Sequence, residues 1–294
     1  MSTATEQRQQ VVSAAIREIS HIATLPEITL RIVELVEDPK STAQDLHKVI
    51  SKDPALCGRI LKVVNSSFYG LPGQIASINR AIVMLGLNAV KNIAIAASLA
   101  KLFRGGELTA RFSAKDLWTH STLTAAAAKI TSDSLKMGIS DEAFLAGLMH
   151  DIGLMVEMQY DRSKLIDIME KMSVDASGAP TADLIALESE CFGASHQDFG
   201  AGLCEKWKFP RSFAAVTGFH HRPLELPPDQ RKLVCIVHIA DRLAAETGQG
   251  FRLDLPSIEI DPAVRDELKI TVDRLDEIRR NFIENSKSVM DLLA

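Results

Sequence analysis

Apolar side chains recur at helical spacing along nearly the whole chain. Val11, Ala15 and Ile19 share one face, and similar spacing is found over residues 30–36 and 46–50. A repeat of three to four residues allows one face of an α-helix to be buried. Strand signals are weak, because the sequence has no long alternating run of β-branched residues and no Asn-Gly turn. The pattern therefore predicts an all-α fold.

Several helix starts are marked by residues suited to a first turn. Asp53 stands before Pro54, so that the aspartate can cap a helix whose first position is proline. Ser140 precedes Asp141 and Glu142, whose negative charges suit the positive end of a helix dipole. We expect helices to begin at both places.

Glycine and proline clusters mark the loops. They lie at residues 70–73, 104–106, 175–180 and 222–229. The Gly105-Gly106 pair is the strongest candidate for a domain boundary, since six of the eight histidines follow it. We predict an N-terminal helical lobe over residues 1–104, a lobe that contains a site over 105–250, and a C-terminal helical extension over 251–294.

The last predicted helix carries a short heptad seam. Leu275, Phe282 and Val289 are seven residues apart, and Ile278 and Leu292 add to the same pattern. The favoured interpretation is a helix that folds back on its own domain. The alternative is a helix that joins two copies of the chain as a homodimer.

The composition is that of a globular protein, with 46% apolar and 24% charged residues. A formal net charge of −5 and only 5% aromatic residues argue against a nucleic-acid binder. The N-terminus lacks a signal-peptide pattern, and the most apolar stretch, Ile93–Ala100, is too short for a bilayer span. The four cysteines show no disulfide pattern. We expect a cytoplasmic protein that binds neither nucleic acid nor membranes.

The sharpest chemical signal is His150-Asp151, inside the apolar segment FLAGLMHDIGLMV. Burial of an imidazole or a carboxylate without a partner is unfavourable. A metal ion is a suitable partner, because imidazole nitrogen and carboxylate oxygen both bind borderline divalent cations. One His-Asp pair alone is weak evidence for such a site.

Further histidines and aspartates strengthen the metal hypothesis, because ligands from several helices can converge inside a bundle. They are Asp116, His120, His196, His220, His221, His238 and Asp241. Alternatives stay open for three of them. His238 is favoured as a core residue over a ligand. For His221, a ligand and a solvated neighbour of a functional His220 are equally favoured. For Asp116, a ligand and a carboxylate at a helix start are equally favoured. His21 and His47 are expected at the surface.

The order His120, His150-Asp151, Asp241 resembles that of the HD phosphohydrolase superfamily. A more specific likeness is carried by LPEITLRIVELVEDP, ISKDPALCGRILKVVNSSFYG and INRAIVMLGLNAVKNIAI, followed by LWTHS, AFLAGLMHDIG, ECFGASHQDFGAGLCEKWKFP and GFHHRP. In this order the segments resemble the HDOD domain, an HD-related output domain of bacterial signalling, over roughly residues 20–245.

The resemblance implies an N-terminal helical bundle packed on an HD-like bundle with a metal site. Many HDOD proteins have lost part of the HD metal set, whereas this chain retains it. The implied ligands are His120, His150 and Asp241 for one ion, and His196, His220 and His221 for a second, with Asp151 shared. Asp151 is also the implied catalytic residue, and Asp116 matches a further ligand position in related HD-GYP phosphodiesterases of cyclic di-GMP. The cofactor is one or two divalent ions of Fe, Mn, Ni or Zn.

Two departures weaken the case for an enzyme. Arg222, Pro223 and Leu224 follow the double histidine, where HD-GYP proteins have an acidic residue and a Gly-Tyr-Pro motif. Leu154 stands where HD enzymes often carry a lysine that favours an anionic substrate.

Three functions therefore compete. The favoured one is a regulatory signalling module that acts through protein partners in trans, its metal site being structural or sensing a ligand such as a nucleotide. The second is a metal-dependent phosphohydrolase or phosphodiesterase acting on nucleotide or cyclic dinucleotide phosphoesters. DNA binding near residues 41–64 comes third, because that segment has few basic residues.

Overall fold

The computed structural model describes residues 4–19, 26–103, 107–176 and 178–290, and nearly all of its regular structure is helical. The regular strands in these ranges are β1 (Glu107–Thr109) and β2 (Phe112–Ser113), which pair antiparallel. The prediction of an all-α fold is therefore confirmed.

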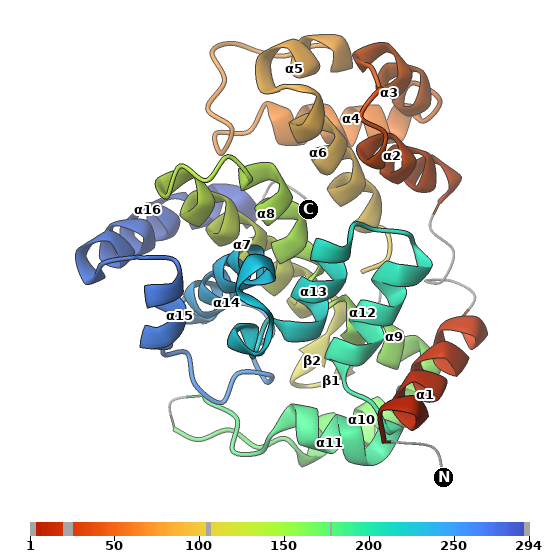
Figure 1. Cartoon of the computed structure of the whole chain (residues 1–294), viewed down its shortest axis with the longest axis vertical. Coiled ribbons are helices and arrows are strands. Elements are labelled where there is room, and N and C mark those ends of the chain that lie inside the picture. Colours follow the sequence, from red (N-terminus) through yellow and green to blue (C-terminus); the bar gives the residue numbers. More distant parts are fainter. Residues whose placement is uncertain (1–3, 20–25, 104–106, 177, 291–294) are drawn as a thin grey trace.

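Five helices form the N-terminal lobe at the top of Figure 1. They are α2 (Glu27–Glu37), α3 (Ala43–Ile50), α4 (Pro54–Val64), α5 (Ile78–Leu85) and α6 (Leu87–Leu99). The expected start of α4 is confirmed, because the Asp53 side chain accepts a hydrogen bond of 2.9 Å from the backbone N–H of Leu56. Buried side chains such as Leu46 and Ile60 fill the space between these helices.

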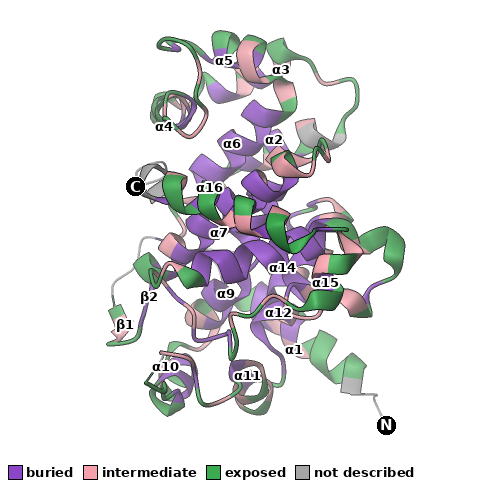
Figure 2. Ribbon diagram, turned by 90° about the vertical axis from the view of Figure 1, so that its left-hand side faces the viewer, coloured by how far each residue is buried: buried purple, intermediate pink, exposed green. Residues whose placement is uncertain are grey.

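Helix α6 joins this lobe to the rest of the molecule. Every residue from Ala89 to Leu99 is buried, as expected for a mainly apolar helix with neighbours on all sides. It packs on α2, α4 and α5 within its own lobe and on α8 (Ser140–Met149) beyond it. In Figure 2 it is the buried helix between the two parts of the molecule.

Helix α7 (Ala114–Ser134) lies at the centre of the second lobe. Helices α8, α14 (Arg231–Glu246) and α16 (Val272–Met290) pack against it. The contact with α8 is close, since a Cβ atom on Gly147 would lie 2.9 Å from the Cα of Ala125. Helix α8 begins at Ser140, with its acidic residues in the first turn, as predicted.

The remaining helices surround this centre. They are α9 (Ile152–Tyr160), α10 (Arg162–Lys171), α11 (Leu184–Phe192), α12 (His196–Lys206), α13 (Arg211–Phe219) and α15 (Pro262–Glu267), with short 3₁₀ turns at Pro223–Glu225 and Pro228–Gln230. The four cysteines are free, and only Cys204 and Cys235 among them are buried. No helix in the described ranges has both the length and the apolar character that a bilayer crossing requires.

Helix α1 (Ala4–Glu18) packs on α12 and α9 of the second lobe, at the lower right of Figure 1. A Cβ atom on Gly202 would lie 2.4 Å from Cγ1 of Val12, so the missing side chain lets the two helices meet. The proposed boundary at Gly105-Gly106 lies outside the described residues. The limits of the three parts therefore stay a prediction.

Helix α16 folds back on its own chain. Leu275, Ile278 and Phe282 are buried, and the helix packs on α7. This agrees with the favoured interpretation of the heptad seam. Leu292 and the side chain of Val289 lie outside the described residues, and the homodimer stays a prediction.

Candidate metal centre

Seven polar side chains from separate elements meet inside the second lobe. They are His120 of α7, His150 and Asp151 between α8 and α9, His196 at the start of α12, His220 and His221 after α13, and Asp241 of α14. Their side chains are fully buried except that of His221, which is 10% exposed. The positions are distant in the sequence, so the fold alone brings them together.

Glycine allows the His-Asp turn to lie against α12. A Cβ atom on Gly153, in the first turn of α9, would stand 1.8 Å from the backbone oxygen of His196. No real side chain is tolerated at that distance. Gly153 therefore lets α9 approach α12 closely enough for Asp151 to face His196.

The first ligand group contains His120, His150 and Asp241, each with one ligand atom within 4.8 Å of the others. Nε2 of His120 lies 3.0 Å from Oδ1 of Asp241. Nε2 of His150 lies 3.8 Å from the same oxygen and 3.2 Å from Oδ2 of Asp151. The imidazoles and carboxylates thus face a common point.

The second group contains Asp151, His196, His220 and His221, with the same spacing limit of 4.8 Å. Oδ1 of Asp151 lies 3.3 Å from Nε2 of His220 and 3.9 Å from Nε2 of His196. Because its other oxygen faces His150, Asp151 is the carboxylate between the two groups.

The outer ring nitrogens of these histidines are held by hydrogen bonds. Nδ1–H of His150 donates to the Gly147 carbonyl at 2.7 Å, and Nδ1–H of His220 donates to the Val216 carbonyl at 3.2 Å. A carbonyl oxygen can only accept, so the inner Nε2 of each neutral ring carries a lone pair. Two such lone pairs facing the Asp151 carboxylate repel it unless a proton or a metal cation lies between them.

Glu188 of α11 orients His196 and was not found from the sequence. The nitrogen Nδ1 of His196 lies 2.8 Å from Oε2 of Glu188, and the backbone N–H of His196 donates to the same oxygen at 2.9 Å. A carboxylate behind a metal-binding histidine fixes its tautomer and makes it a stronger ligand. Buried Glu157 lies near this pair, and burial together with Glu188 raises its pKa.

Asp254 is a third buried carboxylate that the sequence analysis missed. It forms a group with His221 and Asp241, with ligand atoms within 4.8 Å of one another. Its Oδ2 lies 3.5 Å from Nε2 of His221. Burial raises its pKa, and the negative charges of Asp151 and Asp241 raise it further.

The negative charges of the buried carboxylates are balanced by protons on two of the histidines. Burial lowers the pKa of His150, but the carboxylates of Asp151 and Asp241 outweigh it and raise this pKa to about 9. Burial also lowers the pKa of His196, but the carboxylate of Glu188 outweighs it and raises this pKa to about 9. The pKa of Asp151 lies well below its ordinary value despite burial, chiefly because of His150. Two imidazolium charges thus stand where a metal ion would supply positive charge.

The residues present fit a divalent metal. Both oxygens of Asp151 and of Asp254, and the Nε2 atoms of His150 and His220, are buried without a hydrogen-bond partner among the described residues. Such groups are rarely left without a partner in native proteins. A set of imidazoles and carboxylates is the donor set that Zn, Mn, Fe and Ni accept.

Other residues singled out in the sequence do not join the cluster. Asp116 is exposed, and its Oδ2 accepts a hydrogen bond of 2.7 Å from Oγ of Ser113, so it is the carboxylate at a helix start. Nδ1–H of His238 donates to the His220 carbonyl at 2.7 Å, which makes it a core residue that positions a neighbour. His47 is half-buried on α3, and His21 lies outside the described residues.

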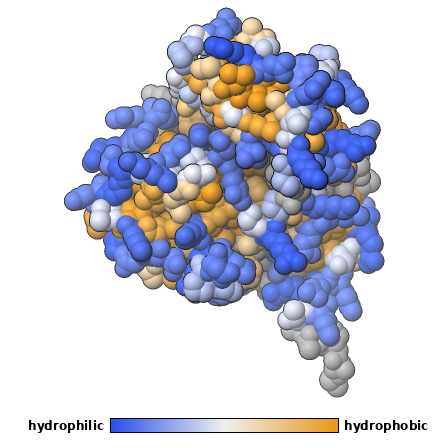
Figure 3. Space-filling model, turned by 45° about the horizontal axis from the view of Figure 1, so that its top comes forward, coloured by the Kyte–Doolittle hydropathy of each residue, from blue (hydrophilic) through white to orange (hydrophobic). Residues whose placement is uncertain are grey.

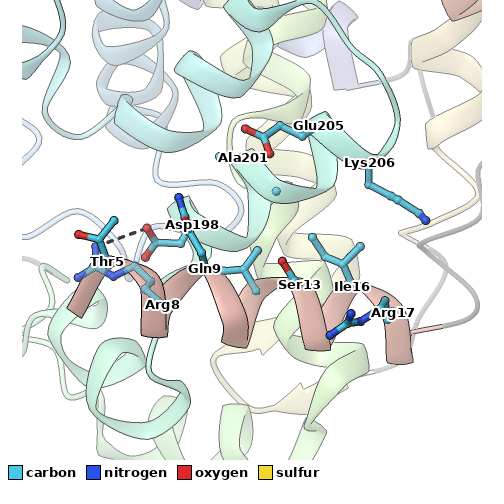
Figure 4. A pocket seen from close by; sticks show the side chains of 12 residues that line it. Thr5, Arg8, Gln9, Ser13, Ile16, Arg17, Asp198, Ala201, Glu205 and Lys206 are labelled. Carbon is cyan, nitrogen blue, oxygen red and sulfur yellow. Dashed lines mark ion pairs between the residues drawn. The ribbon is translucent and has the colours of Figure 1, made fainter. Parts of the chain in front are cut away.

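A cavity of about 770 Å³ lies away from this centre. It lies between α1 and α12 and contains the Arg8–Asp198 ion pair of 3.5 Å (Figure 4), but none of the seven side chains lines it. A smaller cavity of about 390 Å³ is lined by His221, Arg222 and His238. The centre therefore approaches the surface at His221.

The chain is thus a helical protein in which a His-Asp turn meets histidines and an aspartate from other helices. The HDOD domain family matches residues 22–223, about two thirds of the chain, and the chain belongs to this family. The match ends before Asp241 and Asp254.

Solved structures of two other proteins share the fold. An HDOD domain protein of unknown function from Geobacter sulfurreducens has a TM-score of 0.81 at 23% identity, with 98% of this chain and 99% of that chain covered. A protein named as a candidate phosphohydrolase from Shewanella amazonensis SB2B has a TM-score of 0.75 at 22% identity, with coverages of 98% and 100%. At these identities the likeness shows the fold.

A curated relative in sequence is an uncharacterized protein of Treponema pallidum (strain Nichols). It is 24% identical over 239 residues, which are 80% of this chain. The match spans only 44% of that protein's length.

Proposed function

We propose that this protein is an HDOD signalling module that holds an HD-type metal centre and acts through protein partners. One observation carries the proposal: a closed cluster of imidazoles and carboxylates whose inner atoms have no other partner among the described residues. A cluster of this kind needs a cation to be stable in a neutral, unprotonated state.

The proposed centre holds one or two divalent ions of Fe, Mn, Ni or Zn. One ion would be held by His120, His150, Asp151 and Asp241, and a second by Asp151, His196, His220 and His221. When bound, the ions supply positive charge and Lewis acidity to this pocket.

Burial favours a structural or sensing role over catalysis. Structural metal sites are closed by protein ligands, whereas catalytic sites keep a position open to solvent. Only His221 among the proposed ligands is exposed at all. Leu154 is fully buried, and the guanidinium of Arg242 is engaged by the His238 carbonyl at 3.0 Å. Neither residue is placed to receive an anionic substrate.

The surface of the N-terminal lobe supports an interaction role. Figure 3 shows an apolar area among hydrophilic atoms at the top of the molecule. Val83 of α5 is 73% exposed, although valine is usually buried. Signalling proteins in trans are the proposed partners, and a nucleotide is the proposed small ligand.

Metal analysis of the purified chain tests the centre. We expect at least about half an equivalent of Fe, Mn, Ni or Zn, and a large loss in His150→Ala, because His150 belongs to the first group and lies 3.2 Å from the shared Asp151. His47→Ala is the matched control, since His47 lies on α3 away from the cluster. A metal-free protein that rebinds none of these ions contradicts the proposal.

A phosphohydrolase is the second candidate, favoured by the cavity that His221 and Arg222 share. In that case Asp151 acts as a ligand and as a proton acceptor. Turnover of a generic phosphodiester by the metal-loaded protein is the test, with loss expected in Asp151→Asn and retention in the exposed Asp229→Asn control. Equal turnover in both variants would assign the activity to a contaminant.

A further inference from the structure

The irregular segment between α14 and α15 crosses α7 beside the metal centre. Gly250 permits the crossing, because a Cβ atom there would lie 2.6 Å from the backbone nitrogen of His120, and its φ is +78°. The N–H of Phe251 donates to the Asp116 carbonyl at 3.1 Å. The Phe251 ring packs edge-on against Phe112 with centroids 5.2 Å apart. The segment is therefore fixed where it passes His120.

This anchoring directs Asp254 into the protein. Its neighbours Leu253 and Leu255 are buried in the core, at 6% and 0% exposure, and Asp254 itself is 3% exposed. Neither of its carboxylate oxygens has a hydrogen-bond partner among the described residues. A buried carboxylate without a donor destabilises a fold unless another group compensates it.

The groups that face Asp254 are metal-ligand candidates. Its Oδ2 lies 3.5 Å from Nε2 of His221, which belongs to the second group. One of its oxygens also lies within 4.8 Å of a ligand atom of Asp241, which belongs to the first group. Asp254 thus has an oxygen within 4.8 Å of ligand atoms from both groups, and it stands outside the part of the chain that matches the family.

We propose that Asp254 is an additional metal ligand, a second carboxylate shared between the two ion positions. This inference rests on the proposed metal centre. With Asp151 and Asp241 it would give the two ion positions three carboxylate ligands.

The test compares the full-length chain with Asp254→Asn, which keeps the size of the side chain and removes its charge. Metal is removed with a chelator, and Mn²⁺ or Zn²⁺ is then titrated by calorimetry, with Tm measured before and after loading. We expect the loss of one equivalent or at least about tenfold weaker binding, as for removal of a group that supports a metal site. The Tm of the metal-free variant should equal or exceed that of the wild type, because a repulsive buried charge is gone.

Two further variants make the outcome decisive. Asp254→Glu keeps a carboxylate and should recover most of the binding even if Asp254→Asn folds poorly, and Asp229→Asn should bind like the wild type. Asp254 is structural and the inference is wrong if Asp254→Asn binds metal as the wild type does, whether or not its metal-free Tm falls. The proposed metal centre stands in that case. If the wild type binds neither metal, both fail.

Discussion

At the scale of single residues, His150 shows how its surroundings determine the charge of a side chain. Its Nδ1–H is held by the Gly147 carbonyl, and its Nε2 faces the carboxylates of Asp151 and Asp241. In the metal-free protein these carboxylates hold a proton on the ring, and a metal ion would displace that proton. Metal binding and protonation therefore compete at the same atom.

This competition predicts opposite effects of pH on the two forms. The pKa of His150 and of His196 is raised from 6.5 to about 9 in the folded chain, so their stabilising protons are present below pH 6.5 and are lost as the pH rises through 9. Between pH 7 and 9 the metal-free protein should lose up to about 1.4 kcal/mol of unfolding free energy per pH unit per histidine. Metal affinity should rise over the same range, because the ligands must be unprotonated.

Urea unfolding at several pH values, with chelator and with metal, checks this prediction. His150→Gln, which cannot hold the proton, should make the slope of the metal-free protein shallower. The histidines with lowered pKa, such as His221, are neutral above pH 7 in both folded and unfolded chains and do not contribute. A stability that is flat from pH 7 to 9 contradicts the argument.

The sequence was most informative about the site where its residues stand in adjacent pairs. His150-Asp151 and the histidine pair at 220–221 are visible because they are adjacent, and the fold does bring them together. Asp254 was missed because it lies in an irregular segment, where no helical period predicts which way a side chain points. Its position between Leu253 and Leu255 was the available signal, a charged residue within an apolar run. Glu188 was missed because its role depends on the position of α11 beside His196 at the start of α12.

At the scale of elements, the packing of α9 on α12 controls the second ligand group. Gly153 lies at this contact, and His196 is the first residue of α12. The start of α12 is also fixed by a capping box, in which Oδ2 of Asp198 accepts hydrogen bonds of 2.9 Å from the N–H and Oγ of Ser195. Both devices fix the position of His196 relative to Asp151.

Gly153→Ala should therefore disturb the centre from within a helix. The added methyl group cannot fit beside the His196 carbonyl, and overpacking of this kind costs about 1–3 kcal/mol or more. We expect a lower Tm and weaker metal binding. Gly58→Ala is the control, since nothing lies within 4 Å of a Cβ at Gly58. That change in an exposed helix should stabilise the protein by about 0.8–1 kcal/mol. Equal behaviour of the two variants would refute the contact argument.

Helix starts could be predicted from the sequence, but the packing partners of the helices could not. Asp53 caps α4, and Ser140 begins α8 with two acidic residues in its first turn; both signals are local interactions. Helix α1 was assigned to the N-terminal part on its place in the sequence, yet it packs on α12. Its partner is determined by the absence of a side chain at Gly202, a residue distant in the sequence.

At the scale of the whole molecule, the two lobes share an aromatic contact on the helix that leads to the His-Asp turn. The ring of Phe68, in the segment that follows α4, lies 6.2 Å from that of Phe144 on α8. Helix α8 leads directly into His150. The N-terminal lobe therefore supports the helix that leads to the His-Asp turn, which links that lobe physically to the His/Asp cluster.

Phe144→Ala should weaken this link. Phe144 is 1% exposed, and removal of a buried phenylalanine ring costs about 3–5 kcal/mol of unfolding free energy. Denaturant unfolding measures the loss, and metal titration should show weaker binding as α8 loosens. Val83→Ala, at a residue 73% exposed, should leave both quantities unchanged. A loss below about 1 kcal/mol would mean that the lobes do not depend on this contact.

The segment that crosses α7 at Gly250 would affect how fast a bound metal ion leaves the proposed centre. Because α7, α14 and this anchored segment surround the proposed centre and His221 alone among the proposed ligands reaches the surface, a bound ion would leave slowly. The metal found after purification would therefore be the one that was abundant in the cell while the chain folded. Cultures grown with extra manganese and cultures grown with extra zinc would then yield protein that contains different metals.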